Sequence, residues 1–329
     1  MLDEAIASVA QQQGIELSRI GIIIIDDNSS PAVDVQVLRS RFPCQLTVHR
    51  NNTPCGLAYN RDKGVQLATA DVVLHLDDDD KLAPDALATI AQFFTEHPTQ
   101  ESVFLGVEGF GKSEQHFQRV QTQGLEKITK RCEPTRASED VLFFKRSLPP
   151  TTSSTAPMCF QRVAIKKALW LKTNNLRLQA YQKSTASEER DDSMGKLTGP
   201  LRDPEWSIYH SLLTTPALLN KAICRERTSG RKDRSITAMR DKQVHAQIAI
   251  KQQLVKASEY LPELQPFKQQ IKRNMADTFF NEAYYQLHTL NNRAQAFRYW
   301  IKAQSAEKRL EYAKFAFTLC LPQVLLSNK

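Results

Sequence analysis

The chain has 329 residues, of which 41% are hydrophobic and 24% charged, and its formal net charge is +8. This size allows one large globular domain with appendages, or two domains. No apolar run approaches the ~20 residues of a membrane-spanning helix, and the N-terminus lacks the pattern of a signal peptide, so we expect a cytoplasmic protein. The six cysteines are scattered, without the paired spacing of a zinc or redox motif, and we expect reduced thiols.

Charge is spread unevenly along the chain. Residues 1–100 contain 7 Lys or Arg against 14 Asp or Glu, so the excess of base lies in the remaining part. A basic second part suits an anionic partner such as a diphosphate, an anionic membrane surface or nucleic acid. Charge alone does not choose among them.

The first hundred residues alternate between helix and strand patterns. Strands are predicted at 20–25, 44–50 and 71–76, and helices at 2–13, 31–39, 54–68 and 84–95. This alternation predicts an α/β fold, with a mostly parallel sheet covered by helices on both faces.

After residue 100 the pattern is weaker. "SVFLGV" at 102–107 and "VLFF" at 141–144 are strand candidates, and the polar stretch 182–203 is predicted to be a loop. From about residue 238 helical periodicity dominates, and its aromatic residues are expected to pack in a core. We therefore expect a catalytic domain over 1–235 and a helical region over 236–329.

Two of the predicted strands end in carboxylates. Asp26 and Asp27 follow the first strand, and the run Asp77–Asp80 follows the third. In an open parallel sheet both would lie at the edge where ligands bind. Two or three carboxylates there could hold Mg²⁺ or Mn²⁺, which neutralises phosphate oxygens. A run of acids can also be a solvated turn, but two acidic strand ends in one sheet favour a cation site because clustered anions repel.

The segment "IIIIDDNSS" is followed by a spaced set of residues: Asn51 or Asn52, Gly56, Arg61, Gly64, Leu76, Asp77, Asp79, Asp80, Pro84 and Leu87. This pattern resembles family 2 glycosyltransferases, which have the GT-A fold. "IIIIDDNSS" is similar to the family's strand followed by Asp-Asp-x-Ser, and the similarity covers residues 2–95.

The resemblance implies a donor site. Asp26 and Asp27 would lie at the nucleotide, and Asp27 would accept a hydrogen bond from the base. Asp77 would lie near the ribose, and Asp78 would also bind the donor. Asp77 and Asp79 would hold the metal, Mg²⁺ or Mn²⁺.

The sequence leaves two possible roles for the Arg61 side chain. The resemblance implies that it helps to hold the nucleotide, whereas an arginine in a helix could also simply face water. The family usually has Ala-Arg-Asn where this chain has Asn60, Arg61 and Asp62. That departure puts close nucleotide packing there in doubt.

Inverting sugar transfer needs a carboxylate to take the acceptor's proton. "RDPEWSIYHSLL" resembles the family's Glu-Asp-Trp segment, which makes Glu205 the candidate base and Asp203 its alternative. Both could merely favour a helix N-terminus electrostatically. Asp191 and Asp192 also remain candidates.

A basic segment, "ICRERTSGRKDRS", follows where family members often carry one near the diphosphate. A phosphate contact could come from Arg225, Arg227 or Arg231.

The resemblance also implies that a strand is missing. Family members begin with an apolar strand directly before the helix that here starts at Leu2, and that strand lies centrally, between those at 20–25 and 71–76. We expect that Met1 is internal to a longer protein, or that this form folds poorly and has little activity. The alternative is direct pairing of the two strands.

The implied reaction moves a sugar from a nucleotide-diphosphate donor to a hydroxyl of a saccharide or lipid-linked acceptor. The setting would be surface polysaccharide synthesis, with contact to an anionic membrane at its inner face and no nucleic acid. The alternative is a catalytically impaired truncated homologue acting as a basic RNA-binding or scaffold protein.

Two other enzyme-like readings are disfavoured. A response-regulator receiver would use Asp77 as phosphoacceptor, but its acidic pair ends the first element, whereas here a helix comes first. A haloacid-dehalogenase-like phosphatase would need Thr or Val where Lys81 stands.

Overall fold

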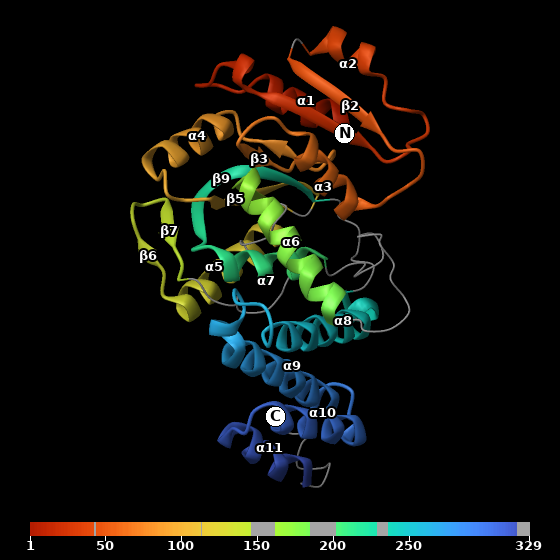
Figure 1. The fold of residues 1–329 in the computed structure, drawn as a ribbon, viewed down its shortest axis with the longest axis vertical. Helices are drawn as coiled ribbons and strands as arrows, with labels where there is room; N and C mark the ends of the chain where they lie inside the picture. Colours follow the sequence, from red (N-terminus) through yellow and green to blue (C-terminus); the bar gives the residue numbers. More distant parts are fainter. Residues whose placement is uncertain (43, 113, 146–161, 185–201, 229–235, 321–329) are drawn as a thin grey trace. The chain divides into compact units, whose positions relative to one another are not determined.

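The computed structural model describes residues 1–42, 44–112, 114–145, 162–184, 202–228 and 236–320 (Figure 1). They divide into two compact units, Met1–Arg177 with Arg190–Lys232, and Leu178–Glu189 with Asp233–Lys329. The described strands all belong to the first unit, and the second is helical. Within the described ranges, no helix combines the length and apolarity needed to cross a membrane.

The chain begins with a small parallel sheet and two helices. Strands β1 (Gly21–Asp26) and β2 (Gln45–Arg50) pair in parallel along their whole length. Helices α1 (Leu2–Ala10) and α2 (Val35–Arg41) pack on this sheet, where Ile6, Leu38 and Leu46 are buried in one cluster. These elements confirm the predictions for residues 2–50.

Helix α2 begins later than predicted, because Asp34 caps it. The Asp34 carboxylate accepts hydrogen bonds from the backbone N–H groups of Gln36 and Val37. Such a cap satisfies N–H groups that have no partner within the helix and fixes where it starts.

Three predicted elements follow, each slightly shorter than expected. They are α3 (Leu57–Leu67), β3 (Val72–Leu74) and α4 (Ala86–Glu96). Single-turn 3₁₀ helices occur at Leu17–Arg19 and Gln265–Phe267.

The larger sheet has seven strands in the order β3-β8-β5-β9-β7-β6, with β4 on β9. The strands not yet given are β4 (Lys81–Leu82), β5 (Ser102–Gly111), β6 (Thr135–Arg136), β7 (Val141–Phe143), β8 (Val163–Lys166) and β9 (Ala217–Thr228). Among the described strands of this sheet, only β5 and β9 pair in parallel. The prediction of a mostly parallel sheet is therefore wrong, because β8 enters antiparallel between β3 and β5.

The two acid-bearing strands do not share a sheet. Among the described residues β1 pairs with β2 and β3 with β8, and β1 does not pair with β3. Placing both in one sheet was wrong, and so was the alternative of direct pairing. Helix α3 instead packs on both, since Gly64 lies against Ile25 of β1 and Val65 clusters with Val73 of β3.

Helices cover both faces of the larger sheet, as predicted. Alternate residues of β5 face opposite cores, because side chains along a strand alternate between faces. Val103 and Leu105 pack with residues of α4 such as Ile90. On the other face Phe104 packs with Trp170 of α6 (Lys167–Ser184) and with α7 (Arg202–Leu213). Helix α5 (Glu114–Cys132) contributes Ile128 to the same core.

One glycine is required where β5 meets β9. The pairing register shifts around Gly106, and a Cβ there would lie 2.3 Å from the backbone oxygen of Lys221. Only glycine allows this close approach of two backbones.

The predicted loop over 182–203 is wrong at both ends. Helix α6 continues to Ser184 and α7 already begins at Arg202. Residues 185–201 lie outside the described residues, so the rest of that prediction is not tested.

The second unit contains the predicted helical region. Its helices include α8 (Ile236–Ala257), α9 (Lys268–His288), α10 (Arg293–Ala306) and α11 (Leu310–Cys320). Phe280 stacks on Tyr312 with ring centroids 4.5 Å apart, which confirms aromatic packing here. Tyr284 and Phe297 are exposed, so the prediction of core packing was wrong for these two.

Candidate active site

Asp26 lies at the end of β1 and is buried. Its carboxylate accepts hydrogen bonds from the backbone N–H groups of Ser29 (2.8 Å) and Val33 (3.2 Å), and it pairs with Arg50 at the end of β2. Burial raises its pKa, but these donors outweigh that effect and hold the pKa at about 2. Asp26 therefore fixes the turn after β1. A direct contact with a nucleotide stays a prediction.

Asp27 holds the loop between β2 and α3. Its Oδ1 accepts from Asn51 Nδ2 (2.8 Å) and the Cys55 N–H (2.7 Å), and its Oδ2 accepts from the Gly56 N–H (2.9 Å). Burial raises the pKa of Asp27, but these bonds, together with one to the Asn60 side chain, lower it below its usual value. A contact of Asp27 with the base stays a prediction.

Gly56 has a conformational reason for its place in this loop. Its φ is +83°, a backbone conformation that side chains disfavour, and it caps α3. The sequence left Asn51 and Asn52 as alternatives. The structure buries Asn51, which contacts Asp27, and exposes Asn52.

Helix α3 connects the two acidic loops through successive residues. Asn60 Oδ1 accepts a hydrogen bond from Asn51 Nδ2 at 2.7 Å, on the Asp27 side. Arg61 Nη2 donates to Asp77 Oδ1 at 2.8 Å, on the side of the acid run. Arg61 is buried, so the reading as a surface helix residue is wrong.

The next residue of α3, Asp62, accepts hydrogen bonds from three side chains. Its Oδ1 accepts from Trp170 Nε1 (3.1 Å) and Asn174 Nδ2 (2.5 Å), both on α6, and Oδ2 accepts from Gln66. This departure from the family pattern therefore attaches α3 to α6.

The acid run forms a turn in which the carboxylates differ. Asp77 is paired with Arg61, and Asp78 is exposed. Burial raises the pKa of Asp79, and the negative charges of Asp78 and Asp77 add to that shift. Burial also raises the pKa of Asp80 to about 7, although it accepts a hydrogen bond from the Arg227 N–H.

This donor set fits a hard divalent cation. Mg²⁺ is commonly held by one or two carboxylates together with substrate phosphates, and the crowded charge around Asp79 would be relieved by such an ion. The residues that would hold it are Asp79 and Asp77. Within the described ranges, no three His, Cys, Asp or Glu residues group to hold a metal by themselves.

Basic residues of β9 border the acid run. Arg227 donates from Nε to the backbone oxygen of Asp79 (3.0 Å) and from Nη2 to Glu4 of α1 (2.8 Å). Arg225 pairs with Glu108 at 2.6 Å. The guanidinium groups of Arg225 and Arg227 lie 5.9 and 4.7 Å from the Phe110 ring centroid. Arg231 lies outside the described residues.

A buried row of aromatic rings runs from β3 to α7. His75 contacts Trp170 at 4.6 Å between ring centroids, Trp170 contacts Trp206 at 4.8 Å, and Trp206 stacks on His210 at 4.7 Å. Burial lowers the pKa of His210 to about 3, so this ring is neutral at pH 7. The row links the strand before the acid run to the helix that carries the candidate base.

For the candidate bases on α7, the structure describes the backbone but not the side chains. Asp203 and Glu205 lie in the first turns of α7, and Trp206 beside them is buried. Their side chains, together with Asp191 and Asp192, fall outside what the structure describes. Their roles stay predictions.

Sequence reasoning missed several residues of this site. Phe110 and Glu4 were not singled out, because each acts through contacts with distant segments, and Asn60 was noted only as a departure from the family pattern. A polar residue beside Arg61 on the same helix was the one available signal for Asn60.

Comparison with known proteins finds a family match for the N-terminal part of the chain. Residues 1–148 match the profile of glycosyl transferase family 2. A Haemophilus influenzae protein described as an uncharacterized glycosyltransferase is 29% identical over 194 residues, which cover 58% of this chain and 55% of that protein. The chain thus spans about half the length of this curated relative.

Solved structures show the same fold. TarS of S. aureus matches with a TM-score of 0.54 at 16% identity, over 94% of this chain and 47% of that chain. A 1–349 fragment of TarS in complex with UDP-GlcNAc matches with a TM-score of 0.53 at 16% identity, over 93% of this chain and 77% of that one. Residues 1–148 therefore match glycosyl transferase family 2 in sequence, and the chain shares the fold of these solved structures.

Proposed function

We propose that this chain transfers a sugar from a nucleotide-diphosphate donor to an acceptor hydroxyl. The family assignment of residues 1–148 supports a glycosyltransferase, and one matching TarS structure holds UDP-GlcNAc. The observation that carries the proposal for this chain is the connection through α3. Asn60 and Arg61 tie the Asp27 loop and the acid run to one rigid helix, as a bound nucleotide sugar would require.

The donor would lie along these two loops. Asp27, with Asp26 behind it, would face the base, and Asp77 and Asp78 would face the ribose and diphosphate, with Arg61 fixing Asp77. A divalent cation, Mg²⁺ or Mn²⁺, held by Asp79 and Asp77, would neutralise charge on the diphosphate. Arg227 lies against the same turn and could add a phosphate contact.

The reaction would proceed in one displacement with inversion. The acceptor oxygen forms a bond to the anomeric carbon, and the bond from that carbon to the diphosphate oxygen breaks with its electron pair leaving on the diphosphate. The acceptor's proton passes to a carboxylate, for which we propose Glu205, with Asp203 as the alternative.

The acceptor would be a saccharide or a lipid-linked saccharide, in surface polysaccharide synthesis. A chain at the cytoplasmic side could reach a lipid-linked acceptor by contact with an anionic membrane surface. The basic excess after residue 100 supports an anionic partner of this kind.

The competing proposal is a basic RNA-binding or scaffold protein. Among the described basic residues near residue 225, Arg225 and Arg227 are already paired with carboxylates, which weakens it. Melting temperatures separate the two, because a ligand that binds only the folded state raises stability. We expect stabilisation by Mn²⁺ with nucleoside diphosphates. Stabilisation by oligonucleotides alone would favour the competing proposal.

A further inference from the structure

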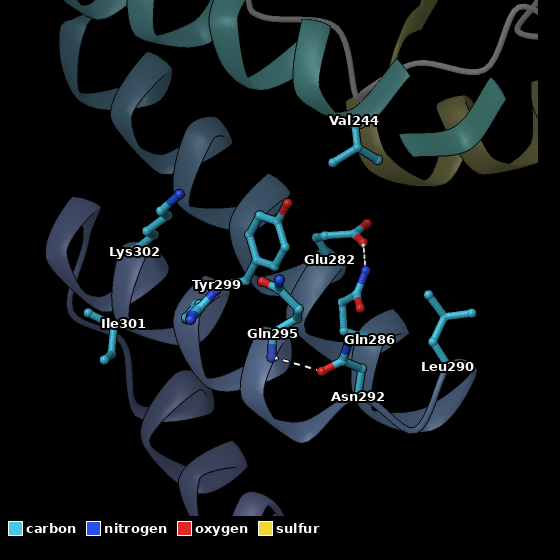
Figure 2. A pocket seen from close by; sticks show the side chains of 10 residues that line it. Val244, Glu282, Gln286, Leu290, Asn292, Gln295, Tyr299, Ile301 and Lys302 are labelled. Carbon is cyan, nitrogen blue, oxygen red and sulfur yellow. Dashed lines mark hydrogen bonds between the residues drawn. The ribbon is translucent and has the colours of Figure 1, made fainter. Parts of the chain in front are cut away.

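The second unit contains a groove of about 680 Å³ with a mixed polar and apolar lining, formed between α9 and α10 with Val244 of α8 (Figure 2). This volume lies within the ~300 to 1,000 Å³ typical of small-molecule sites. Its polar lining consists of Glu282, Gln286, Asn292, Gln295, Arg298 and Lys302.

The base of the groove is held in place before any ligand binds. Glu282 and Gln286 of α9 are 3% and 9% exposed, and Gln286 Nε2 donates to Glu282 Oε1 at 2.8 Å. At the start of α10, Asn292 Oδ1 accepts from the Gln295 N–H at 3.1 Å. Figure 2 shows both bonds beside the groove. Polar groups fixed in this way lose little entropy when a ligand binds.

The mixture of polar groups selects the ligand's chemistry. A carboxylate only accepts hydrogen bonds, arginine and lysine only donate, and amides do both. A hydroxyl-rich ligand satisfies all three kinds, because each hydroxyl donates and accepts. Arg298 and Lys302 outnumber the one carboxylate in the lining, so inorganic phosphate is the comparison ligand that separates simple anion binding from saccharide binding.

Apolar surface lies in the same groove. Tyr299 lines it, and Leu290 and Ile301 are 50% and 44% exposed at its rim. Aromatic side chains combine an apolar ring with a polar handle, which suits the C–H faces of a sugar ring.

We propose that this groove is a saccharide-binding site in the helical unit, separate from the candidate donor site. Sugar hydroxyls would bond to Glu282, Gln295 and Arg298, with Tyr299 against a sugar face. The inference needs neither a donor nor transfer activity, so it does not rest on the proposed function.

The test is binding of saccharides to the full chain, measured by ligand-observed NMR. The panel comprises neutral oligosaccharides and oligosaccharides with uronic acids, and inorganic phosphate is the comparison ligand. We expect a saccharide to bind, and the double variant Gln295→Ala, Arg298→Ala to weaken its affinity at least ~10-fold, or 1.4 kcal/mol. Lys314→Ala, an exposed lysine on α11, is the matched control and should bind as the parent does.

Three results would overturn the proposal. They are no binding by any saccharide of the panel at ~10 mM, binding of phosphate without saccharide, and equal affinity in the double variant and the parent. Loss of saccharide binding in Asp27→Ala, with the double variant unaffected, would locate the sugar in the first unit instead. Failure of the proposed transfer reaction would leave saccharide binding at this groove unchanged.

Discussion

Asn51 donates a hydrogen bond from its side-chain Nδ2 to Asp27 at 2.8 Å, joining the two residues that directly follow the paired strands β2 and β1. The same nitrogen lies 2.7 Å from the Asn60 oxygen on α3. Asn51 is buried, so these bonds are partly shielded from water and fix the loop that would face the base. Asp27 is the acceptor on which this arrangement depends.

Asp27→Ala should weaken donor affinity without eliminating Mn²⁺ binding, because Asp27 orders the base-facing loop while the proposed metal ligands lie elsewhere. The variant removes the acceptor for three donors, and each lost bond costs about 0.5 to 1.5 kcal/mol. Calorimetry with nucleoside diphosphates measures the effect. A variant that binds every nucleotide as tightly as the parent would remove Asp27 from the site.

Asp79→Ala should abolish metal-dependent donor binding while leaving the fold intact. Burial and like charges already disfavour the ionised form of Asp79, so its removal relieves repulsion in the protein without metal. Calorimetric titration with Mn²⁺ and a nucleotide sugar checks the prediction. Asp71→Ala, an exposed aspartate before β3, is the control. Unchanged affinities in Asp79→Ala would exclude Asp79 as a ligand.

Glu205→Gln keeps the side chain's shape but removes its basicity. If Glu205 is the general base, turnover should fall by ~100-fold or more while donor affinity holds. Steady-state rates and donor titrations of both variants separate these effects. The same loss in Asp203→Asn, with Glu205→Gln active, would move the assignment two residues toward the N-terminus of α7.

Lys251→Met should stabilise the second unit at neutral pH. Lys251 is buried against Thr278, and burial lowers its pKa to about 8 from the usual 10.5, with Asp277 partly opposing the shift. Between these values the unfolded state binds more protons, so this lysine makes stability rise with pH there. Below pH 8 the folded state carries a buried charge, and its removal should gain ~1 to 3 kcal/mol.

Urea unfolding at pH 7 and pH 10 tests the lysine prediction. The advantage of Lys251→Met should shrink at the higher pH, where the native lysine is neutral. Lys256→Met, an exposed lysine on the same helix, should show no such trend. An equal advantage at both pH values would mean that Lys251 is not titrating as described.

Local patterns predicted much of the fold of the first hundred residues. Alternating apolar runs and turn residues are properties of short segments, which is why β1, β2 and α3 were found close to their observed bounds. The order of the larger sheet depends on β8 and β9, which come from distant parts of the chain. Their insertion has no local signal, so the antiparallel pairing of β3 with β8 was missed.

In the candidate site, too, some features were visible in the sequence and others depend on how distant segments pack. Acid residues after strands were visible in the sequence, whereas the burial of Arg61 against Asp77 depends on how α3 packs. The contact of Arg227 with Asp80 likewise depends on the pairing of β4 with β9. Residue types were therefore predictable, and their partners were not.

The most direct test of the proposed function is a panel of nucleotide sugars incubated with the purified chain and Mn²⁺, scored for release of the nucleoside diphosphate. The account predicts that at least one sugar nucleotide is hydrolysed or transferred, that chelation of the metal stops the release, and that Asp79→Ala shows none. Release that is equal in Asp79→Ala and the parent, or no release and no binding for any nucleotide sugar, would contradict it.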